Sequence, residues 1–266
     1  MAPSVNATQS FRDLHHHENV LLLPNAWDAA SARLLARAGA KAVATSSASM
    51  SWSLGYPDGS VLPPEQLVSA VHRICRLLPI PLTVDIEDGF SAAPDDVADL
   101  AAAVAAAGAA GINIEDGAGS VELLARKIAA IRARNGCASL FINARTDVFL
   151  RSLARGADAT AMVVQRGLSY AEAGADGLFV PGLSSLTDVS RIAKAVPLPL
   201  NLMTVPGLAP LQELAQAGVR RLSAGPATFL STYSHFCTSA AAFLQGDVNS
   251  FPGGELTYDE MNALTA

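Results

Sequence analysis

The sequence predicts an α/β fold, a (β/α)8 barrel of the TIM type in which eight parallel strands alternate with eight helices. Short apolar runs of strand type alternate along the chain with segments rich in alanine and leucine. One helix-to-strand turn recurs as RAGAKAV, AAGAAGI, EAGADGL and QAGVRRL, and its glycine suits the left-handed residue that ends a helix. An open doubly wound sheet is the alternative, but no Gly-x-Gly-x-x-Gly motif follows the first expected strand.

The expected strands are short and apolar, as strands are when helices cover a parallel barrel. In chain order they span residues 20–24, 41–47, 81–87, 111–116, 140–147, 176–181, 199–204 and 220–225. The expected helices span residues 27–38, 64–78, 95–107, 120–134, 157–173, 186–195, 208–217 and 226–245. Helix starts are marked by Pro63, Pro64, Pro94 and Ser120, and helix ends by Gly39, Gly108, Gly174 and Gly218.

No segment of linker composition divides the chain, so residues 1–246 are expected to form one barrel domain. Residues 247–266 are polar and glycine-rich, and we expect a loose extension or an oligomer contact there. The net charge of −6 gives no support for nucleic-acid binding, and the three cysteines lack metal-finger or redox spacing. The N-terminus lacks the basic-then-apolar order of a signal peptide. The longest stretch without strong polarity is alanine-rich and is interrupted by Asp99, which does not suit a membrane span. We therefore expect a cytoplasmic protein without a membrane span.

Polar side chains gather where the expected strands end, which is the edge of such a barrel that carries its chemistry. The third, fourth and fifth strands end in Asp85 and Glu87, in Glu115, and in Asn143 and Arg145. Side chains two residues apart share one face of a strand, so the parity of these strands directs all five into the barrel mouth. The sequence therefore predicts three acids from neighbouring strands facing one arginine.

Three carboxylates at such spacing repel one another and need a nearby cation. Two unit charges about 6 Å apart cost about 3 kcal/mol at an effective dielectric constant of about 20. Hard oxygen ligands with few histidines nearby favour Mg²⁺, with Mn²⁺ as a substitute. Arg145 would then bind a substrate carboxylate or phosphonate through two parallel hydrogen bonds. The alternative is a salt-bridge network of Asp85, Glu87 and Arg145 without a metal.

Several motifs, in order over about residues 20–230, resemble those of a known superfamily. They are LPNAWDAASARLL, TSSASMSWSLGYPDG, DIEDGF, GAAGINIED, NARTD, GADGLFVPG and PLNLM. With these motifs the chain resembles the isocitrate lyase and phosphoenolpyruvate mutase superfamily. The resemblance implies a Mg²⁺-dependent barrel that cleaves or rearranges a C–C or P–C bond through a metal-stabilised enolate. Its substrate would be a small 2-oxo acid, a dicarboxylate or a phosphonopyruvate-type compound.

The resemblance also implies roles for individual residues. The implied metal ligands, acting largely through water, are Asp85, Glu87 and Glu115. The implied catalytic residues are Arg145, Glu115 and Asp58, which follows the second strand and would lie near the metal. The residues implied to bind and orient the substrate are Ser46, Ser47, Asp85, Arg145 and Asn201.

The chain departs from this superfamily after the fourth strand, where lyases and mutases carry a gating loop. Only Gly117 to Gly119 separate the strand tip from the next helix. Ser120 is expected to cap that helix, and Lys127 lies two turns into it. A lid so short cannot close over the site, which counts against isocitrate and methylisocitrate lyase activity. An oxaloacetate-type decarboxylase, a pyruvyl aldolase and a catalytically degenerate oxo-acid-binding protein stay as alternatives.

The last expected helix, ATFLSTYSHFCTSAAAFLQ, is amphipathic and carries aromatic residues of exposed character. In the superfamily that the chain resembles, the last helix is often exchanged between subunits. We therefore expect a homodimer or homotetramer with a swapped C-terminal helix, with packing inside one chain as the alternative. Near the other terminus, His15, His16 and His17 are expected to be solvated at the N-terminal helix.

Overall fold

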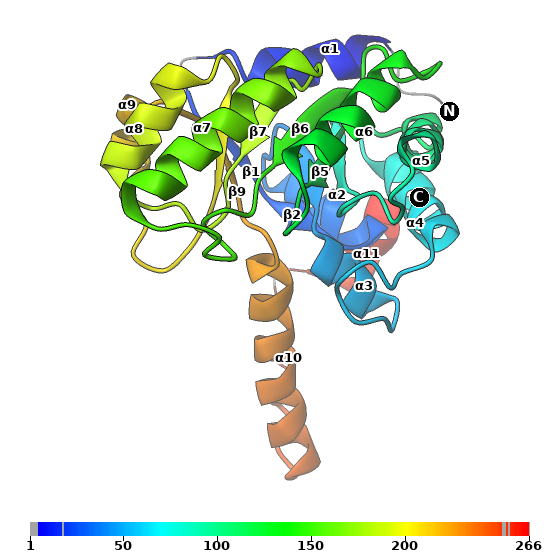
Figure 1. Cartoon of the computed structure of the whole chain (residues 1–266). Coiled ribbons are helices and arrows are strands. Elements are labelled where there is room, and N and C mark those ends of the chain that lie inside the picture. Colours follow the sequence, from blue (N-terminus) through cyan, green and yellow to red (C-terminus); the bar gives the residue numbers. More distant parts are fainter. Residues whose placement is uncertain (1–4, 18, 252–253, 255, 266) are drawn as a thin grey trace.

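A computed structural model describes residues 5–17, 19–251, 254 and 256–265 and shows a parallel barrel covered by helices (Figure 1). Its strands are β1 (Leu21–Leu23), β2 (Asn25–Ala26), β3 (Val43–Thr45), β4 (Leu82–Asp85), β5 (Gly111–Glu115), β6 (Phe141–Arg145), β7 (Gly177–Phe179), β8 (Leu200–Met203) and β9 (Val219–Ser223). Within the described residues they form one parallel sheet in the order β1-β9-β8-β7-β6-β5-β4-β3-β2. The predicted TIM-type barrel is confirmed.

The first predicted strand is split in two, and this split brings the two ends of the sheet together. Pro24 separates β1 from β2 and has no N–H to donate, so the strand changes its pairing partner there. β1 pairs with β9 on one side, and β2 pairs with β3 on the other. The sheet therefore closes through a single interrupted strand, which reconciles the nine segments with the eight strands that were predicted.

The helices that follow the strands lie close to their predicted positions. They are α2 (Ala29–Arg37), α4 (Pro64–Leu77), α5 (Pro94–Ala106), α6 (Val121–Ala133), α7 (Gly156–Glu172), α8 (Leu186–Ala195), α9 (Leu211–Ala217) and α10 (Ala227–Leu244). Three described helices lie outside the eight predicted ranges: α1 (Val5–Leu14), α3 (Ser47–Ser53) and α11 (Tyr258–Thr265). None of the helices in the described ranges combines the length and the apolar character that crossing a bilayer requires.

Part of the C-terminal extension is folded rather than loose. α11 packs against α2, where Arg33 Nε donates a hydrogen bond to the carbonyl oxygen of Leu264 at 2.9 Å. Arg37 lies 3.7 Å from the Glu260 carboxylate in the same contact. The extension therefore returns to the barrel wall after α10, and the division of the chain at residue 246 stays a prediction.

Local sequence signals set the helix ends as predicted. The glycines of the recurring turn all have left-handed backbones, with φ of 97° at Gly39, 115° at Gly108, 102° at Gly174 and 106° at Gly218. The Ser120 hydroxyl accepts a hydrogen bond from the N–H of Leu123 at 3.2 Å and so caps α6. These contacts involve residues close in sequence, which is why the sequence could specify them.

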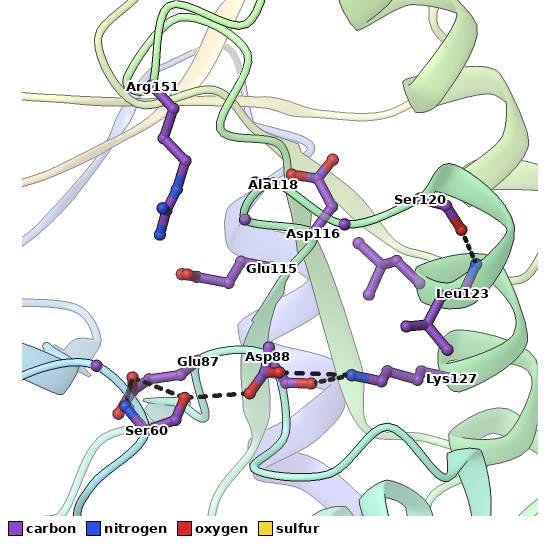
Figure 2. A pocket seen from close by; sticks show the side chains of 14 residues that line it. Ser60, Glu87, Asp88, Glu115, Asp116, Ala118, Ser120, Leu123, Lys127 and Arg151 are labelled. Carbon is purple, nitrogen blue, oxygen red and sulfur yellow. Dashed lines mark hydrogen bonds and ion pairs between the residues drawn. The ribbon is translucent and has the colours of Figure 1, made fainter.

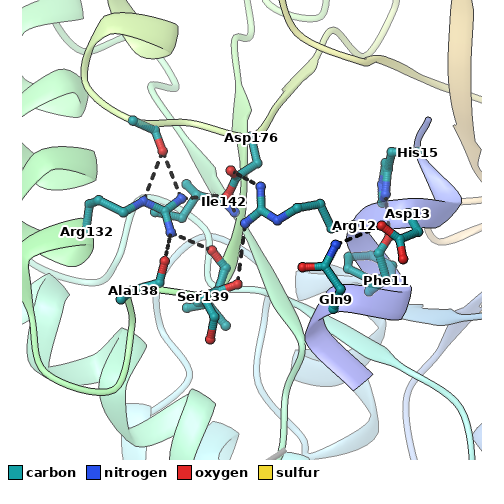
Figure 3. Close-up of polar contacts among 12 residues, drawn as sticks. Gln9, Phe11, Arg12, Asp13, His15, Arg132, Ala138, Ser139, Ile142 and Asp176 are labelled. Atoms are coloured by element: carbon teal, nitrogen blue, oxygen red, sulfur yellow. Dashed lines mark hydrogen bonds and ion pairs between the residues drawn. The ribbon is translucent and has the colours of Figure 1, made fainter. Parts of the chain in front are cut away.

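Helix α1 (Val5–Leu14) seals the end of the barrel where the strands begin. Phe11 is fully buried there, and its ring would lie 2.9 Å from a Cβ placed on Gly111, the first residue of β5. Arg12 of α1 and Arg132 of α6 both bind the Asp176 carboxylate, Arg132 at 2.6 Å (Figure 3). The floor of the barrel is therefore closed by an aromatic plug and held by an ion-pair network.

The structure contradicts the expectation that all three histidines after α1 are solvated. His16 and His17 are exposed, but His15 is only 2% exposed. Its ring stacks on Phe141 with 4.1 Å between the ring centroids. Burial, with the charge of Arg221 adding to it, lowers the pKa of His15 to about 3. His15 is therefore a neutral part of the barrel floor, because a helix end directs one of three adjacent side chains inward.

The burial of His15 makes the free energy of unfolding depend on pH. Below pH about 6.5 the unfolded chain binds a proton that the folded chain excludes until pH about 3, so this stability is lost as pH falls. The expected loss is about 1.4 kcal/mol per pH unit, or about 2 kcal/mol between pH 6.5 and 5. Urea denaturation at both pH values measures it. His15→Leu should remove this contribution and the control His16→Leu should keep it; equal slopes for both variants would contradict the assignment.

Candidate active site at the barrel mouth

The carboxyl end of β4 places Asp85 at the barrel mouth, on the side that strand parity predicted. Asp85 is 8% exposed, and its backbone N–H donates to Thr45 Oγ1 at 2.9 Å, which ties β4 to β3. The Asp85 carboxylate accepts hydrogen bonds from the N–H of Glu87 at 3.1 Å and from the N–H of Ser47 at 3.4 Å. One backbone donor from the turn after β4 and one from the start of α3 therefore fix this carboxylate.

Glu87 lies in a tight turn beyond β4, so the strand ends two residues earlier than predicted. The backbone is left-handed at Glu87 (φ 53°) and at Gly89 (φ 91°). A Cβ on Gly89 would lie 2.5 Å from the Val97 side chain, so only glycine fits. The Glu87 carboxylate accepts hydrogen bonds from the N–H and the hydroxyl of Ser60, on the loop that follows α3. The turn therefore holds Glu87 over the rim of the barrel.

β5 and β6 bring Glu115 and Arg145 together, as their register pairing requires. Arg145 Nη1 lies 2.6 Å from the Glu115 carboxylate. Its Nε and Nη2 donate to the two carboxylate oxygens of Asp147 at 2.7 and 3.1 Å. Arg145 does not form the salt-bridge network with Asp85 and Glu87 that the sequence left as an alternative; its ion pairs are with Glu115 and Asp147.

Burial dominates the electrostatics of these acids. It raises the pKa of Asp85 and of Glu87, and the nearby charge of Asp58 adds to both shifts. Burial also outweighs the Arg145 charge and raises the pKa of Glu115 to about 8, with Asp85 contributing in the same direction. The carboxylates therefore disfavour one another's charged forms, and an added cation would relieve that repulsion.

Asp116, which follows Glu115, belongs to a separate structural network. Its carboxylate accepts hydrogen bonds from Arg166 Nη1 and from the Tyr170 hydroxyl, both at 2.6 Å, and from the N–H of Asp147 at 3.0 Å. Asp116 is 7% exposed, and both side-chain donors come from α7. The sequence placed two acids at this strand tip, and the structure gives them opposite directions.

The remaining predicted residues surround the same mouth. Ser46 is buried at the start of α3, where its side chain makes no capping hydrogen bond. Asp58 is exposed on the loop after α3, within electrostatic range of Asp85 and Glu87. Asn201 is 1% exposed on β8, and its Oδ1 accepts a hydrogen bond from the Ser223 hydroxyl at 3.1 Å.

A pocket of about 320 Å³ opens beside this cluster (Figure 2). Its lining includes Glu87 and Glu115 together with the segment from Gly117 to Ser120 that replaces a gating loop. Together with Asp116, this segment is the whole connection between β5 and α6. The pocket therefore stays open on the side where a longer loop would cover it.

Two positively charged residues that line the pocket, Lys127 and Arg151, were not among the predicted site residues. Lys127 is 3% exposed, and its Nζ donates to the carbonyl oxygen of Asp88 at 2.6 Å (Figure 2). Arg151 donates from Nε to an Asp147 oxygen at 3.0 Å and is half-exposed. A lysine on the apolar face of α6, one residue before the buried Ile128, was an available signal for Lys127. Arg151 lies on an irregular loop and gave no such signal.

The acids at the mouth suit a hydrated divalent cation. Within the described ranges, no three His, Cys, Asp or Glu side chains lie close enough together to enclose a metal ion. Asp85, Glu87 and Glu115 nonetheless supply hard carboxylate oxygens, and Mg²⁺ commonly keeps several of its waters. Because repulsion from other acids contributes to their raised pKa values, these residues fit a cation held partly through water.

Comparisons with known proteins agree with this architecture. Residues 11–244 match the sequence model of the phosphoenolpyruvate phosphomutase family. An uncharacterized protein of Mycobacterium tuberculosis is 37% identical over 253 residues, covering 93% of this chain and 94% of the relative. The 2-methylisocitrate lyase of Salmonella typhimurium is 31% identical over 200 residues, covering 72% of this chain and 68% of that enzyme.

A solved structure supports the same assignment. A Burkholderia cenocepacia protein, described provisionally as a phosphonomutase, has a TM-score of 0.83 and 40% sequence identity to this chain. The match covers 90% of this chain and 99% of that one. The chain therefore belongs to the phosphoenolpyruvate mutase/isocitrate lyase superfamily, whose named members here are lyases and mutases.

Proposed function

We propose that the protein is a Mg²⁺-dependent lyase or phosphonomutase-like enzyme that forms an enolate from a small 2-oxo acid, dicarboxylate or phosphonopyruvate-type substrate. The observation that carries this proposal is that Asp85, Glu87 and Glu115 lie within electrostatic range of one another at one rim of the barrel, where Glu87 and Glu115 line an open pocket. Mg²⁺, or Mn²⁺ in its place, would supply stabilisation of the negative charge that develops on the substrate oxygen.

The chain's own residues would bind and orient the substrate. Ion pairs with Glu115 and Asp147 hold the Arg145 guanidinium in place, and it would bind a carboxylate or phosphonate of the substrate. The uncommitted hydroxyl of Ser46, together with Ser47, would bind a second charged end from the start of α3. Asn201 would orient the substrate from β8. Asp58 would act near the metal, since its charge already raises the pKa of Asp85 and of Glu87.

A decarboxylase acting on oxaloacetate-type substrates is the second candidate. The oxaloacetate decarboxylase of Pseudomonas entomophila is 27% identical over 259 residues and covers 94% of this chain, more than the methylisocitrate lyase covers. The short connection from Gly117 to Gly119 also favours a reaction that needs no long lid. Loss of CO₂ gives an enolate, so the same residues would serve both reactions.

A substrate panel followed by NMR tests these alternatives. Oxaloacetate, 2-methylisocitrate and phosphonopyruvate are incubated with the protein, with Mg²⁺ or with EDTA in its place. Conversion that requires Mg²⁺ supports the proposal, and ³¹P spectra separate P–C chemistry from decarboxylation. Thermal stabilisation by these compounds without any product would instead identify a degenerate binding protein. Conversion that is unchanged in EDTA would contradict the assigned metal.

We also propose that the protein assembles by exchanging α10. α10 runs away from the barrel rather than covering the last strand (Figure 1), and Leu230, Phe236 and Phe243 on it are about half exposed. A groove of about 730 Å³, whose lining includes Leu22 and Leu222, stays open on the barrel wall along β1 and β9. In a (β/α)8 barrel a helix normally covers each strand. An α10 from a second copy supplies the missing cover and gives a homodimer, or a homotetramer built from dimers.

Phe236→Glu is expected to convert this oligomer to monomers, because a carboxylate on the apolar face of α10 cannot be buried against another subunit without a large desolvation penalty. Light scattering after size-exclusion chromatography measures the mass. The control is Leu211→Glu, which makes the same kind of change at an exposed position of α9. A Phe236→Glu protein with the wild-type mass would contradict exchange of this helix.

A further inference from the structure

Arg221 is a fully buried arginine in the interior of the barrel. It starts on β9, and its Nη2 donates to Asn113 Oδ1 on β5 at 3.1 Å. Three strands separate β9 from β5 around the sheet, so the side chain crosses the interior. Phe11 closes the floor beneath it, with its ring centre 6.0 Å from the guanidinium. Among the described residues, no carboxylate lies within ion-pair distance of Arg221.

The charge of Arg221 is therefore not neutralised by direct contact. Burial lowers the pKa of Arg221 to about 9, and Asp85 is the charge that acts in the opposite direction. The guanidinium still carries its proton at neutral pH. An apolar side chain of similar length would avoid the penalty of burying this charge, and such replacements often stabilise proteins. The fold alone gives no reason for arginine at this position.

The surroundings of Arg221 contain two hydrogen-bond donors without a partner among the described residues. These are Arg221 Nη1 itself and Nδ2 of Asn201. Ser223 links the two side chains, since its hydroxyl accepts from Arg221 Nε at 3.4 Å and donates to Asn201 Oδ1 at 3.1 Å. Asn201 and Arg221 are also register partners in β8 and β9. One connected group of side chains thus combines a positive charge with two free donors.

This group lies below the proposed active site. Asn113, which Arg221 binds, is the register partner of Asp85 on the neighbouring strand. Asn113 also accepts a hydrogen bond from Asn143 Nδ2 at 2.9 Å, so β5, β6, β8 and β9 contribute side chains to one polar layer. TIM barrels normally fill this layer with branched apolar side chains. A positive charge in this layer without an ion-pair partner among the described residues favours an anion in the mouth above it.

We propose that Arg221 is a positioning residue that supports binding of a small dianionic carboxylate at the barrel mouth, at a cost in fold stability. Arg221 holds the side chain of Asn113 directly and that of Asn201 through Ser223. It also places a positive charge beneath the ligand. This inference rests on the proposed function, because it takes the mouth as the site of an anionic oxo acid. It adds a residue whose role is electrostatic and which lies outside the acidic rim.

The test compares Arg221→Met and Arg221→Lys with the control Arg220→Met, which removes the neighbouring arginine on the outer side of β9. The probe is oxalate, the ligand bound with Mg²⁺ in a phosphonopyruvate hydrolase structure of the same fold. Calorimetry gives Tm, and titration with oxalate in excess Mg²⁺ gives Kd for each folded variant.

We expect Arg221→Met to weaken oxalate binding by about tenfold or more, since charge acts strongly across a dry interior. Arg221→Lys should recover part of that loss, and Arg220→Met should bind as the wild type does. Tm of Arg221→Met should equal or exceed that of the wild type. Wild-type affinity in Arg221→Met would overturn the inference, as would Arg221→Lys binding no better than Arg221→Met.

Failure of the proposed function is distinguishable from failure of this inference. A wild-type protein that does not bind oxalate with Mg²⁺ counts against the proposed function. The Tm comparison then decides the inference by itself. A Tm of Arg221→Met at or above the wild-type value supports the inference that the buried charge of Arg221 lowers the stability of the fold. A clear fall in Tm identifies Arg221 as an ordinary structural residue.

Discussion

Asp85→Asn is expected to lower kcat/KM by about a thousandfold or more while the fold stays intact. The proposed function places the metal at Asp85, and losing that charge stabilisation corresponds to about 4 kcal/mol in the activation free energy. Asparagine keeps one oxygen, which can still accept the 3.1 Å hydrogen bond from the N–H of Glu87, while its amide nitrogen cannot accept the longer 3.4 Å bond from the N–H of Ser47. Burial raises the pKa of Asp85, so a neutral side chain relieves an unfavourable charge, which offsets the loss of one long hydrogen bond, and Tm should change little.

The measurement is product formation by NMR from the best substrate of the panel, with Mg²⁺ in excess. Asp95→Asn is the matched control, because Asp95 is an exposed acid at the start of α5 that does not line the pocket. Wild-type turnover in Asp85→Asn would remove this residue from the chemistry. A fall in Tm together with lost activity would show that Asp85 serves the fold rather than the reaction.

Asp116→Ala is expected to lower the free energy of unfolding by about 3–5 kcal/mol, because it leaves Arg166 buried without its carboxylate partner. The variant also removes the acceptor of the Tyr170 hydroxyl and of the Asp147 N–H. For a domain of this size, such a change corresponds to a fall in Tm of about 10 °C or more. Urea and thermal unfolding measure both quantities.

The double variant Asp116→Ala/Arg166→Met identifies the cause of that loss. Removing the arginine together with its partner leaves no unpaired buried charge, so the double variant should be more stable than Asp116→Ala alone. If the two variants were equally unstable, the loss would come from packing rather than from the unpaired buried charge of Arg166. Asp85 is thus expected to serve the reaction, whereas Asp116 is expected to stabilise the fold.

The sequence predicted the direction of the Asp85 side chain but not the partners of Asp116. Alternation along the strands directed Asp85, Glu115 and Arg145 into the barrel, and the register pairs of β4, β5 and β6 agree with that direction. The sequence could not identify the partners of Asp116, because Arg166 lies 50 residues further along the chain. Strand alternation fixes the direction of a side chain but contains no information on what another element brings to meet it.

Lys127 and His15 illustrate the same limit. Lys127 lies on a helix that was correctly predicted, yet its contact with Asp88 depends on how α6 packs beside the turn after β4. His15 lies in a polar run that resembles a solvated segment, but α1 packs under the barrel and buries it. In both cases the packing of a whole helix, rather than the residue's own neighbours in sequence, decided the environment.

The sequence by itself determined the barrel class, the order of its elements, most helix ends and the superfamily motifs, because periodicity, glycine turns and caps act over a few residues. The tertiary structure alone decided that Arg145 pairs with Glu115 and Asp147, that α10 leaves the barrel wall, and that Arg221 is buried without a carboxylate partner. Those features depend on which distant segments the closed sheet brings into contact, and on the exclusion of water that follows from closure.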